Sequence, residues 1–429
     1  MSLLPIILLV TQLTPALGQE GEVVQEADTI GIQKADTAGI WTQWRGPSRD
    51  GHVLGEAWPS DLSPANLVEL WRVGELGPSY SGPVADAERV YTTETVDKKF
   101  EVVSAFSRAT GEKLWQRTWE GAMKVPFFAA RNGSWIRSTP ALDGDALYVA
   151  GIRDVLSCLD AETGAIRWTV DFAERFETKL PPFGCASSPL VIGDHLVIQA
   201  GSSLVKLDKR TGETLWRAMV DSGDIMSGGA FSSPVVANLN DRQQLIVQTR
   251  SDLAGVGLDD GKVLWTTPVK AFRGMNILTP TVVGNGVFTS TYGGRAQMFS
   301  VTEGEDGPQV ERTWNAGVQG YMTSPVVVDG HAYLFLRSNR FACIDLAKGE
   351  ECWTSPPTGD EYWSLVVQGD RILALSNTGI LRLIQANPKG YQVLSEREVA
   401  DSETWAHVAP AGNQVFIRSK DSLIALGWK

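Results

Sequence analysis

The stretch Lys206-Leu-Asp-Lys-Arg-Thr-Gly-Glu-Thr-Leu-Trp216 decides the fold, because its pattern recurs along the 429 residues. Cys158–Trp168 and Ala105–Trp115 repeat it, and shorter versions end at Trp265 and Trp353. Each copy predicts a strand, a tight turn and a second strand, since the Thr-Gly pair supplies a turn in which glycine accepts positive φ without steric cost. A spacing of about 45 to 50 residues between copies indicates a propeller or a solenoid.

A second recurring pattern marks the strand that begins each repeat. It consists of a small residue and a proline before an apolar run, and proline is tolerated at the first residue of a strand because no ladder donor is needed there. Its copies begin at Ser81, Ser138, Ser187, Ser232, Leu278 and Thr323. Two further runs, Trp363–Val367 and Trp405–Val408, lack the proline. Eight repeats of four strands predict an all-β, eight-bladed β-propeller, and seven blades are the alternative.

The two ends of the repeat array are complementary. Leu67–Val73 is similar to the last strand of a repeat that has no beginning, while residues 414–429 form a repeat without a last strand. Joining them closes the ring and removes two exposed sheet edges, which otherwise invite aggregation. We therefore expect the strand at about Leu67–Val73 to complete the C-terminal blade.

A tryptophan follows the turn in most repeats and lies on the outer strand. From there it can pack against the neighbouring repeat, so we expect a structural docking role for these residues. They are Trp71, Trp115, Trp168, Trp216, Trp265, Trp314 and Trp353.

The segment before the repeats divides into three parts. Residues 1–18 are typical of a secretory signal peptide, with an apolar core and a small-x-small cleavage site, although the start carries no lysine or arginine. Residues 19–40 are acidic and without strand periodicity, which predicts a disordered mature N-terminus. Residues 41–66 form a tryptophan-containing lead-in, which we expect to pack against the outside or an end of the propeller of residues 67–429.

Composition and charge are ordinary for a globular protein. The chain is 43% hydrophobic and 21% charged, and its net charge of −12 makes binding to nucleic acid unfavourable. No apolar run after residue 18 is long enough to span a bilayer. We therefore predict an exported bacterial protein, periplasmic or extracellular; the alternatives to a signal peptide are an N-terminal membrane anchor or a plain disordered tail.

The four cysteines do not indicate redox or metal chemistry. No Cys-x-x-Cys motif is present and the four histidines have no metal-binding spacing, so we expect no metal site. Cys343 and Cys352 flank the turn at Lys348 and Gly349, which makes them our candidate disulfide across two strands. Cys158 and Cys185 are a weaker pair, and four buried thiols are the alternative.

The Asp-x-x-Thr-Gly-x-x-x-Trp motif of Asp160–Trp168 and Asp208–Trp216 resembles the tryptophan-docking repeat of the pyrroloquinoline quinone (PQQ) propeller superfamily. The resemblance covers about residues 65–429, and five of the eight repeats carry it well. The superfamily includes quinoprotein alcohol dehydrogenases and cofactor-free scaffolds similar to BamB, the outer-membrane assembly lipoprotein. The length of the chain and its lack of large insertions make it more similar to the scaffolds.

The resemblance leaves PQQ with calcium as the alternative to having no cofactor. The dehydrogenases carry adjacent cysteines near the quinone and bind calcium through Glu, Asn and Asp, whereas this chain has no adjacent cysteines and no set that maps onto those ligands. PQQ needs positive charge for its carboxylates and a flat aromatic floor, which Arg137 with Trp363 or Trp405 would supply. We assign no catalytic residue and expect no cofactor; a PQQ-dependent alcohol or sugar dehydrogenase is the alternative function.

One face of the predicted ring carries our candidate binding residues. The hairpins between second and third strands share this face with the connections between blades, and both are rich in cationic and aromatic side chains, which binding sites favour. The candidates are Trp135, Arg137, Arg153, Arg295, Tyr321, Arg337, Arg340, Trp363, Trp405 and His407. The hypothesis is a non-catalytic scaffold that binds a protein, a peptide or an anionic polymer through a basic, aromatic-rimmed face. The alternative is ordinary solvated charge over buried loop aromatics.

Overall fold

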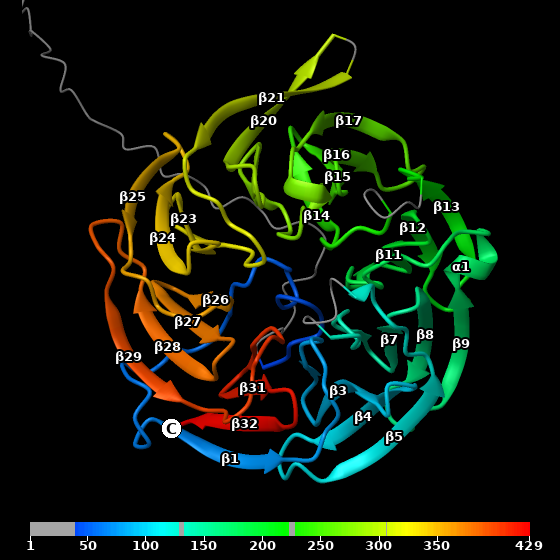
Figure 1. The fold of residues 1–429 in the computed structure, drawn as a ribbon, viewed down its shortest axis with the longest axis vertical. Helices are drawn as coiled ribbons and strands as arrows, with labels where there is room; N and C mark the ends of the chain where they lie inside the picture. The colour runs from blue at the N-terminus through cyan, green and yellow to red at the C-terminus, as the bar shows by residue number, and fades with distance from the viewer. Residues whose placement is uncertain (1–38, 128–132, 223–227, 306) are drawn as a thin grey trace, which may run out of the picture.

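A computed structural model describes residues 39–127, 133–222, 228–305 and 307–429. The predicted signal peptide of residues 1–18 and the segment 19–38 lie outside the described residues. Eight four-stranded antiparallel sheets surround a central axis as the blades of a ring (Figure 1). The chain is therefore an eight-bladed β-propeller, and the seven-bladed alternative is wrong. Within the described ranges, no helix has the length and apolar character needed to cross a membrane.

The strands of each blade follow one another outward from the axis. Blades 1 to 4 contain β2 (Val84–Ala85), β3 (Arg89–Val96), β4 (Phe100–Ser107) and β5 (Lys113–Glu120); β6 (Ala141–Asp143), β7 (Ala146–Ala150), β8 (Val155–Asp160) and β9 (Ile166–Asp171); β10 (Leu190–Ile192), β11 (His195–Ala200), β12 (Ser203–Asp208) and β13 (Thr214–Ala218); and β14 (Val235–Leu239), β15 (Arg242–Gln248), β16 (Asp252–Gly257) and β17 (Val263–Pro268).

The second half of the ring has the same organisation. Blades 5 to 8 contain β18 (Thr281–Val283), β19 (Gly286–Ser290), β20 (Ala296–Gly304) and β21 (Gly307–Ala316); β22 (Val326–Val328), β23 (His331–Leu336), β24 (Arg340–Asp345) and β25 (Glu350–Thr354); β26 (Trp363–Gln368), β27 (Arg371–Ser376), β28 (Ile380–Gln385) and β29 (Val393–Glu398); and β30 (Ala409–Ala411), β31 (Gln414–Arg418), β32 (Leu423–Trp428) and β1 (Leu67–Val73). Two short helical turns, α1 (Phe172–Arg175) and η2 (Phe272–Gly274), lie in connections between blades.

The N-terminal strand closes the ring, as the sequence predicts. β1 pairs antiparallel with β32, so that Leu67 lies opposite Trp428 and Val73 lies opposite Leu423. The blue and red strands of Figure 1 thus share one sheet. The closure is hydrophobic, since Leu67 and Ile424 are both fully buried in one core cluster.

The outer-strand tryptophans join neighbouring blades. Trp115 of β5 lies against Gly164 in a turn of the next blade, and its Nε1 donates to the Ala161 carbonyl at 3.0 Å. Gly164 has a φ of +69°, and a Cβ there would lie 2.5 Å from the indole, so glycine is required both by the turn and by the ring. The same bond from the indole to a carbonyl of the next blade is made by Trp71, Trp168, Trp216, Trp314 and Trp353.

Trp265 differs from these six. Its indole packs in one cluster with Val301 of the next blade, but its Nε1 donates to Gln244 Oε1 of its own blade at 2.7 Å. The reason lies in blade 5, where β20 and β21 are the longest strands of the ring and form a hairpin that projects beyond it (Figure 1). Because this hairpin extends outward, no carbonyl among its described turn residues accepts from Trp265.

Hydroxyl side chains join the inner strands around the axis. In five consecutive junctions, the backbone N–H of the residue before the proline donates to a hydroxyl at the same position of the next blade, at 2.9 to 3.1 Å. The series runs from Gly82 through Thr139, Ser188, Ser233 and Thr279 to Ser324. The pattern of a small residue and proline therefore links blades in addition to starting strands.

The lead-in of residues 41–66 crosses the middle of the ring, where Figure 1 shows it in dark blue. Trp41 exchanges two backbone hydrogen bonds of 2.8 Å with Ala85 of blade 1, and Val53 N donates to Val367 O of blade 7 at 2.8 Å. We expected packing on the outside or an end of the propeller. The structure instead places the first part of this segment on the axis.

Two buried arginines hold the lead-in in this position. Arg45 donates to the carbonyl of Pro325 in blade 6, and Arg49 donates to the carbonyls of Ser188 and Pro189 in blade 3, at 3.1 and 2.8 Å. Burial lowers the pKa of Arg45 to about 10 and that of Arg49 to about 9, where the charge of Arg45 adds to the effect. Both guanidinium groups remain charged at neutral pH, and they connect opposite sides of the ring.

The candidate disulfide between Cys343 and Cys352 is wrong, because both residues are free thiols. The strand pair has a bulge between Cys343 and Ile344, which places Trp353 rather than Cys352 opposite Cys343. Cys343 is buried between the blades, while Cys352 is exposed on β25. Cys158 and Cys185 are also free and buried, as in the alternative of buried thiols.

Candidate binding face

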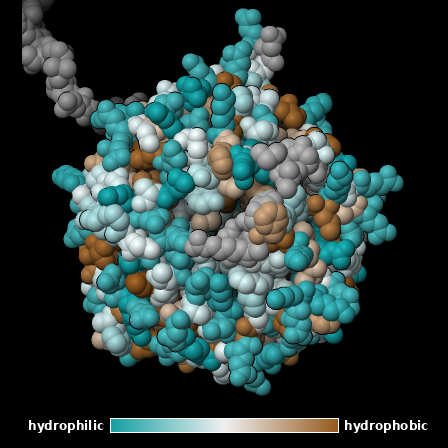
Figure 2. Space-filling view, in the orientation of Figure 1, coloured by the Kyte–Doolittle hydropathy of each residue, from teal (hydrophilic) through white to brown (hydrophobic). Residues whose placement is uncertain are grey.

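We call the face that carries the connections between blades and the second-to-third-strand hairpins the mouth face. The antiparallel order of every blade places these two kinds of loop at the same end of the sheets. Figure 2 shows the ring in the orientation of Figure 1 as a hydrophilic surface interrupted by hydrophobic patches, one of them beside the centre.

Four aromatic side chains form a continuous row on the mouth face. Ring centroids are 5.9 Å apart from Tyr362 to Trp405, 5.7 Å from Trp405 to Tyr80 and 5.2 Å from Tyr80 to Trp135. Each residue lies in a connection that leads into a blade, namely blades 7, 8, 1 and 2, and each is half-buried. We call Tyr362, Trp405, Tyr80 and Trp135 the aromatic row. It brings the candidates Trp135 and Trp405 together.

Charged groups surround the aromatic row. The Arg137 guanidinium lies 5.5 Å from the Tyr80 ring centre and donates to the Gly133 carbonyl at 2.7 Å. Lys420 lies 4.9 Å over the Trp135 ring and pairs with Glu403 at 2.6 Å. Glu403 also accepts from Trp405 Nε1 at 2.6 Å. These cations are therefore held against the rings by cation–π contacts.

A second aromatic cluster lies in the connections before blades 5 and 6 and in the hairpin between β19 and β20. Tyr321 contacts Tyr292 at a ring separation of 5.1 Å, and Phe272 contacts Tyr292 at the same separation. Arg337 lies 4.2 Å over the Tyr292 ring and donates to its hydroxyl at 3.1 Å. The candidates Tyr321 and Arg337 thus meet, but in a cluster separate from the aromatic row.

The remaining arginine candidates are spread along the mouth face. Arg153 and Arg295 are exposed in the equivalent hairpins of blades 2 and 5. Arg340 is half-buried and donates to the Ser355 carbonyl at 2.7 Å within its own blade. Arg153, Arg295 and Arg337 are therefore the exposed cations of the predicted set, while Arg340 serves its own blade.

Trp363 does not belong to the mouth face. Its side chain is 0% exposed, stacks on Phe335 at 4.8 Å and donates Nε1 to Asp360 at 2.8 Å. Trp363 is the first residue of β26, and the alternation of the strand directs it into the core while Tyr362 takes the exposed position. The placement of Trp363 among the binding residues is therefore wrong.

His407 lies on the axis beneath the aromatic row. Its ring meets the Trp44 ring of the lead-in edge-on at 5.9 Å, and Arg45 and Arg49 lie 5.5 and 5.8 Å from that same ring. Burial and the charge of Arg45 lower the pKa of His407 to about 3. His407 is therefore neutral at physiological pH and acts as a wall of the axial packing.

Of the two tryptophans suggested as a floor for PQQ, only Trp405 reaches the surface of the mouth face. Trp363 is buried in the core and offers no floor, and Arg137 is committed to Tyr80 and the Gly133 carbonyl. In the described part of the chain, no group of three or more His, Cys, Asp or Glu side chains is placed to hold a metal ion. Near the axis, Trp44 contacts His407 and the two lead-in arginines.

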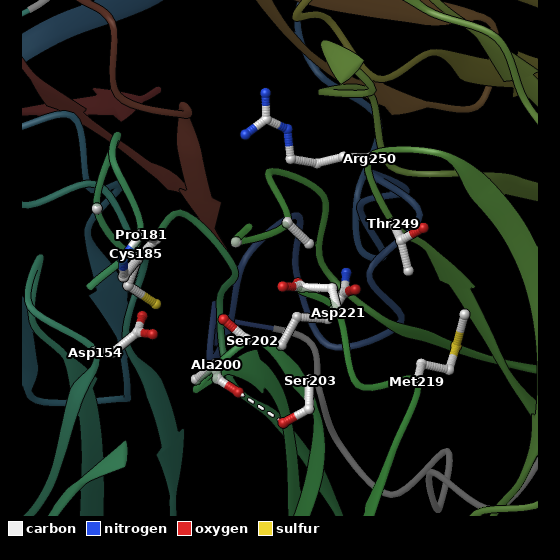
Figure 3. A pocket seen from close by; sticks show the side chains of 14 residues that line it. Asp154, Pro181, Cys185, Ala200, Ser202, Ser203, Met219, Asp221, Thr249 and Arg250 are labelled. Carbon is white, nitrogen blue, oxygen red and sulfur yellow. Dashed lines mark hydrogen bonds between the residues drawn. The ribbon is translucent and has the colours of Figure 1, made fainter. Parts of the chain in front are cut away.

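A cavity between blades 2, 3 and 4 is lined by a buried carboxylate, Asp154, and a buried thiol, Cys185 (Figure 3). Asp154 is 3% exposed and accepts from Gly201 N at 2.9 Å, and its burial raises its pKa to about 6. The Cys185 thiol points toward Asp154 in Figure 3, and burial with this carboxylate holds its pKa well above the usual range. A protonated thiol is a poor nucleophile, so we assign no catalytic role to the pair.

Sequence reasoning missed the lead-in residues and half of the aromatic row. Trp44, Arg45 and Arg49 occur in a segment without periodicity, and only their density in one short stretch signals a role. Tyr80 was not among the candidates, although it stands directly before the first copy of the small-residue and proline pattern at Ser81. Trp135 and Trp405 likewise lie in the connection that precedes an inner strand.

Comparison with known proteins gives a family. A model of the family described as outer membrane protein assembly factor BamB matches residues 99–355. A relative of that name from Yersinia pestis is 24% identical over 267 residues, which cover 56% of this chain and 63% of the relative. The chain thus matches less than two thirds of the length of that relative.

Solved structures show the same fold at lower identity. BamB from Moraxella catarrhalis superposes with a TM-score of 0.60 at 16% identity, over 85% of this chain and 98% of that one. Quinohemoprotein alcohol dehydrogenase from Comamonas testosteroni superposes with a TM-score of 0.61 at 12% identity, over 91% of this chain and 80% of that one. These likenesses concern the propeller fold alone.

Proposed function

This chain belongs to the family of the outer membrane protein assembly factor BamB, and we propose that it is an exported, non-catalytic propeller scaffold that binds protein through its mouth face. The family match over residues 99–355 supports a role in protein assembly. Export to the periplasm or beyond the cell rests on the signal-like residues 1–18.

The aromatic row is the observation that carries this proposal. Aromatic side chains with cations beside them are enriched in the centres of protein interfaces, where they act as anchors. The exposed Arg153, Arg295 and Arg337 widen this surface and steer an acidic partner toward it. An anionic polymer is the other ligand that such cations attract.

A PQQ-dependent alcohol or sugar dehydrogenase is the second candidate, and the fold shared with the Comamonas enzyme favours it. Fold alone is a weak reason, since one fold serves many activities. Titration of the mature chain with PQQ, with and without calcium, followed by tryptophan fluorescence and a dye-linked alcohol assay, separates the two. We expect no saturable quenching, and calcium-dependent quenching with activity contradicts the scaffold.

The scaffold is tested by charge reversal on the mouth face. The variant Arg153→Glu, Arg295→Glu and Arg337→Glu is compared with a matched variant on the opposite face, Arg210→Glu, Lys262→Glu and Lys348→Glu, in the short turns before the outer strands. Both change the charge by the same amount. Capture of envelope proteins by the immobilised chain is measured by quantitative mass spectrometry after crosslinking.

We expect the mouth-face variant to lose about tenfold in capture, because rim charges govern association, while the control stays near the parent. Equal capture by all three proteins excludes the mouth face as the site. Equal loss in both variants assigns the effect to overall charge and contradicts the proposal as well.

A further inference from the structure

The second aromatic cluster is surrounded by positive charge. Four exposed cations lie in the loops of the mouth face around it, and we call them the cationic sector: Lys270, Arg273, Arg295 and Arg337. No Asp or Glu occurs in the loops of this sector, which are residues 269–280, 291–295, 317–325 and 337–339. Within the described ranges, the ion pairs of blades 4 to 7 engage other cations, namely Arg242, Lys262, Lys348 and Arg382. The sector is therefore an uncompensated positive surface on a protein of net charge −12.

Two aromatic rings lie between two of these cations. The Arg337 guanidinium lies 4.2 Å from the centre of the Tyr292 ring. That ring lies 5.1 Å from the Phe272 ring, and the Arg273 guanidinium lies 5.2 Å from the centre of Phe272. The two guanidinium groups are thus at most about 15 Å apart. Apolar surface separates them, since Phe272 is 47% exposed.

Hydrogen bonds hold these side chains in place. Phe272 N donates to Tyr292 O at 2.7 Å, which joins the two loops that carry the rings. Arg250, which is 4% exposed, donates to the carbonyl of Arg273 at 2.7 Å. The Arg337 guanidinium donates to the Tyr292 hydroxyl at 3.1 Å. The surface is therefore largely preorganised, which lowers the entropy that a ligand loses on binding.

The spacing of charge and apolar surface suits an extended peptide. An extended chain rises about 3.3 Å per residue, and its side chains alternate between two faces. Positions i and i+4 therefore lie on one face about 13 Å apart, with position i+2 between them. Carboxylates at the outer positions can then reach Arg273 and Arg337, while an apolar side chain at the middle position lies over Phe272.

The exposed phenyl ring favours a protein segment over an anionic polymer. A polyphosphate or a sulfated glycan pairs with arginines but carries no apolar group for Phe272. An acidic peptide with an apolar residue between its carboxylates buries that ring in addition to pairing with the cations.

We propose that the cationic sector binds an extended acidic segment of a partner protein, in which an apolar residue lies midway between two carboxylates four positions apart. The proposal rests on the scaffold function and specifies its partner and the part of the mouth face that it contacts. Arg273 and Arg337 pair with the two carboxylates, and Phe272 contacts the apolar side chain. Lys270 and Arg295 add to the positive field that attracts the segment.

The test uses the mature chain and a Glu-Ser-Leu-Ser-Glu peptide with blocked ends, measured by isothermal titration calorimetry. The double variant Arg273→Gln with Arg337→Gln removes two charges of the sector. Its matched control is Lys124→Gln with Arg153→Gln, which removes two exposed cations from the blade 2 loops of the same face. Thermal unfolding of each variant verifies the fold.

We expect the double variant in the sector to weaken binding about tenfold, because two ion pairs are lost, and the control to change it less than about twofold. Phe272→Ala should weaken the peptide about fivefold and leave a counterpart with a central serine unchanged. A peptide with glutamine at both ends should not bind. Binding should also weaken between about 0.05 and 0.5 M salt, since exposed charges are screened.

Three results overturn the inference: equal loss in both double variants, equal binding of the glutamine peptide, or tighter binding of inorganic polyphosphate that Phe272→Ala leaves unchanged. Failure of this inference is distinguishable from failure of the scaffold. If envelope proteins are lost by the variant of Arg153, Arg295 and Arg337 but still captured by Arg273→Gln with Arg337→Gln, the chain remains a scaffold that uses another contact.

Discussion

The docking tryptophans and the aromatic row use the same chemistry for opposite purposes. A tryptophan equivalent to Trp115 lies on the outer strand of every blade except blade 7, and the place of Trp115 is fixed by a glycine and a carbonyl of the next blade. Trp405 and Tyr80 stand in the connections of residues 399–408 and 74–83, and they contact one another rather than a turn. The difference teaches that aromatic residues on the outer strands hold the ring together, whereas those in the connections between blades contribute to its surface.

The largest expected loss of stability comes from filling the space into which a docking tryptophan packs. Gly164→Val places a side chain 2.5 Å from the Trp115 indole at a φ of +69°. Steric clash and backbone strain together should lower the free energy of unfolding by about 3 to 5 kcal/mol, measured by urea denaturation.

Gly144→Ala is the control for this change. Gly144 is also a turn glycine of blade 2, with a φ of +57°, but nothing lies within 4 Å of its Cβ position. Only strain then acts, so the loss should be about 1 kcal/mol. Similar losses for both variants would show that the indole contact contributes nothing.

A second test concerns Trp119, a tryptophan that bonds neither a turn nor another ring. Its Nε1 donates to buried Glu101 at 3.2 Å, and the same carboxylate accepts from Ile152 N of blade 2 at 2.6 Å. Burial raises the pKa of Glu101 from 4.5 to about 7. The folded protein therefore binds a proton that the unfolded chain has lost between these pH values.

The sign of this linkage is that stability falls as pH rises from about 4.5 to 7, by about 3 kcal/mol from this one group. Glu101→Gln should flatten that slope, measured as the difference in unfolding free energy between parent and variant across the pH range. Glu112→Gln, an exposed change in the same blade, should leave the slope as it is. A parent slope that survives in Glu101→Gln contradicts the assignment.

The smallest expected effect concerns Trp265, the docking tryptophan whose indole bonds its own blade. Trp265→Phe leaves buried Gln244 without the donor at 2.7 Å, so Gln244→Leu should rescue it by about 1 kcal/mol in a double-mutant cycle. Trp216 bonds the Leu258 carbonyl instead, at 3.2 Å. The same Gln244→Leu should therefore add independently to Trp216→Phe. Equal coupling energies of Gln244 with Trp265 and with Trp216 would show that the two tryptophans do not differ in this respect.

The sequence was sufficient for the blades because their signals are local. The Thr-Gly turn, the proline at the strand start and the tryptophan beside them fix each hairpin without reference to distant residues, and eight such units leave one way to close the ring. Closure through β1 followed from the missing strand at either end. Six of the docking tryptophans obey the same local rule.

The sequence did not predict those residue positions that depend on packing between segments far apart in the chain. Tyr362 and Trp363 are adjacent, and only the register of β26 determines which one faces the mouth. A bulge beside Cys343 shifts the pairing by one residue, so that Trp353 rather than Cys352 lies opposite Cys343. The path of Arg45 and Arg49 through the axis depends on carbonyls of blades 3 and 6, far away in sequence.

The threaded lead-in gives the ring a mechanical property. A force applied ahead of residue 39 meets Trp41, Arg45 and Arg49 at the hub before it reaches β1 at the circumference. These residues are anchored to blades 1, 3 and 6 at once, so the load divides among several blades instead of peeling one strand from its neighbour. A force on the N-terminus therefore acts at the centre of the propeller and is shared by three blades.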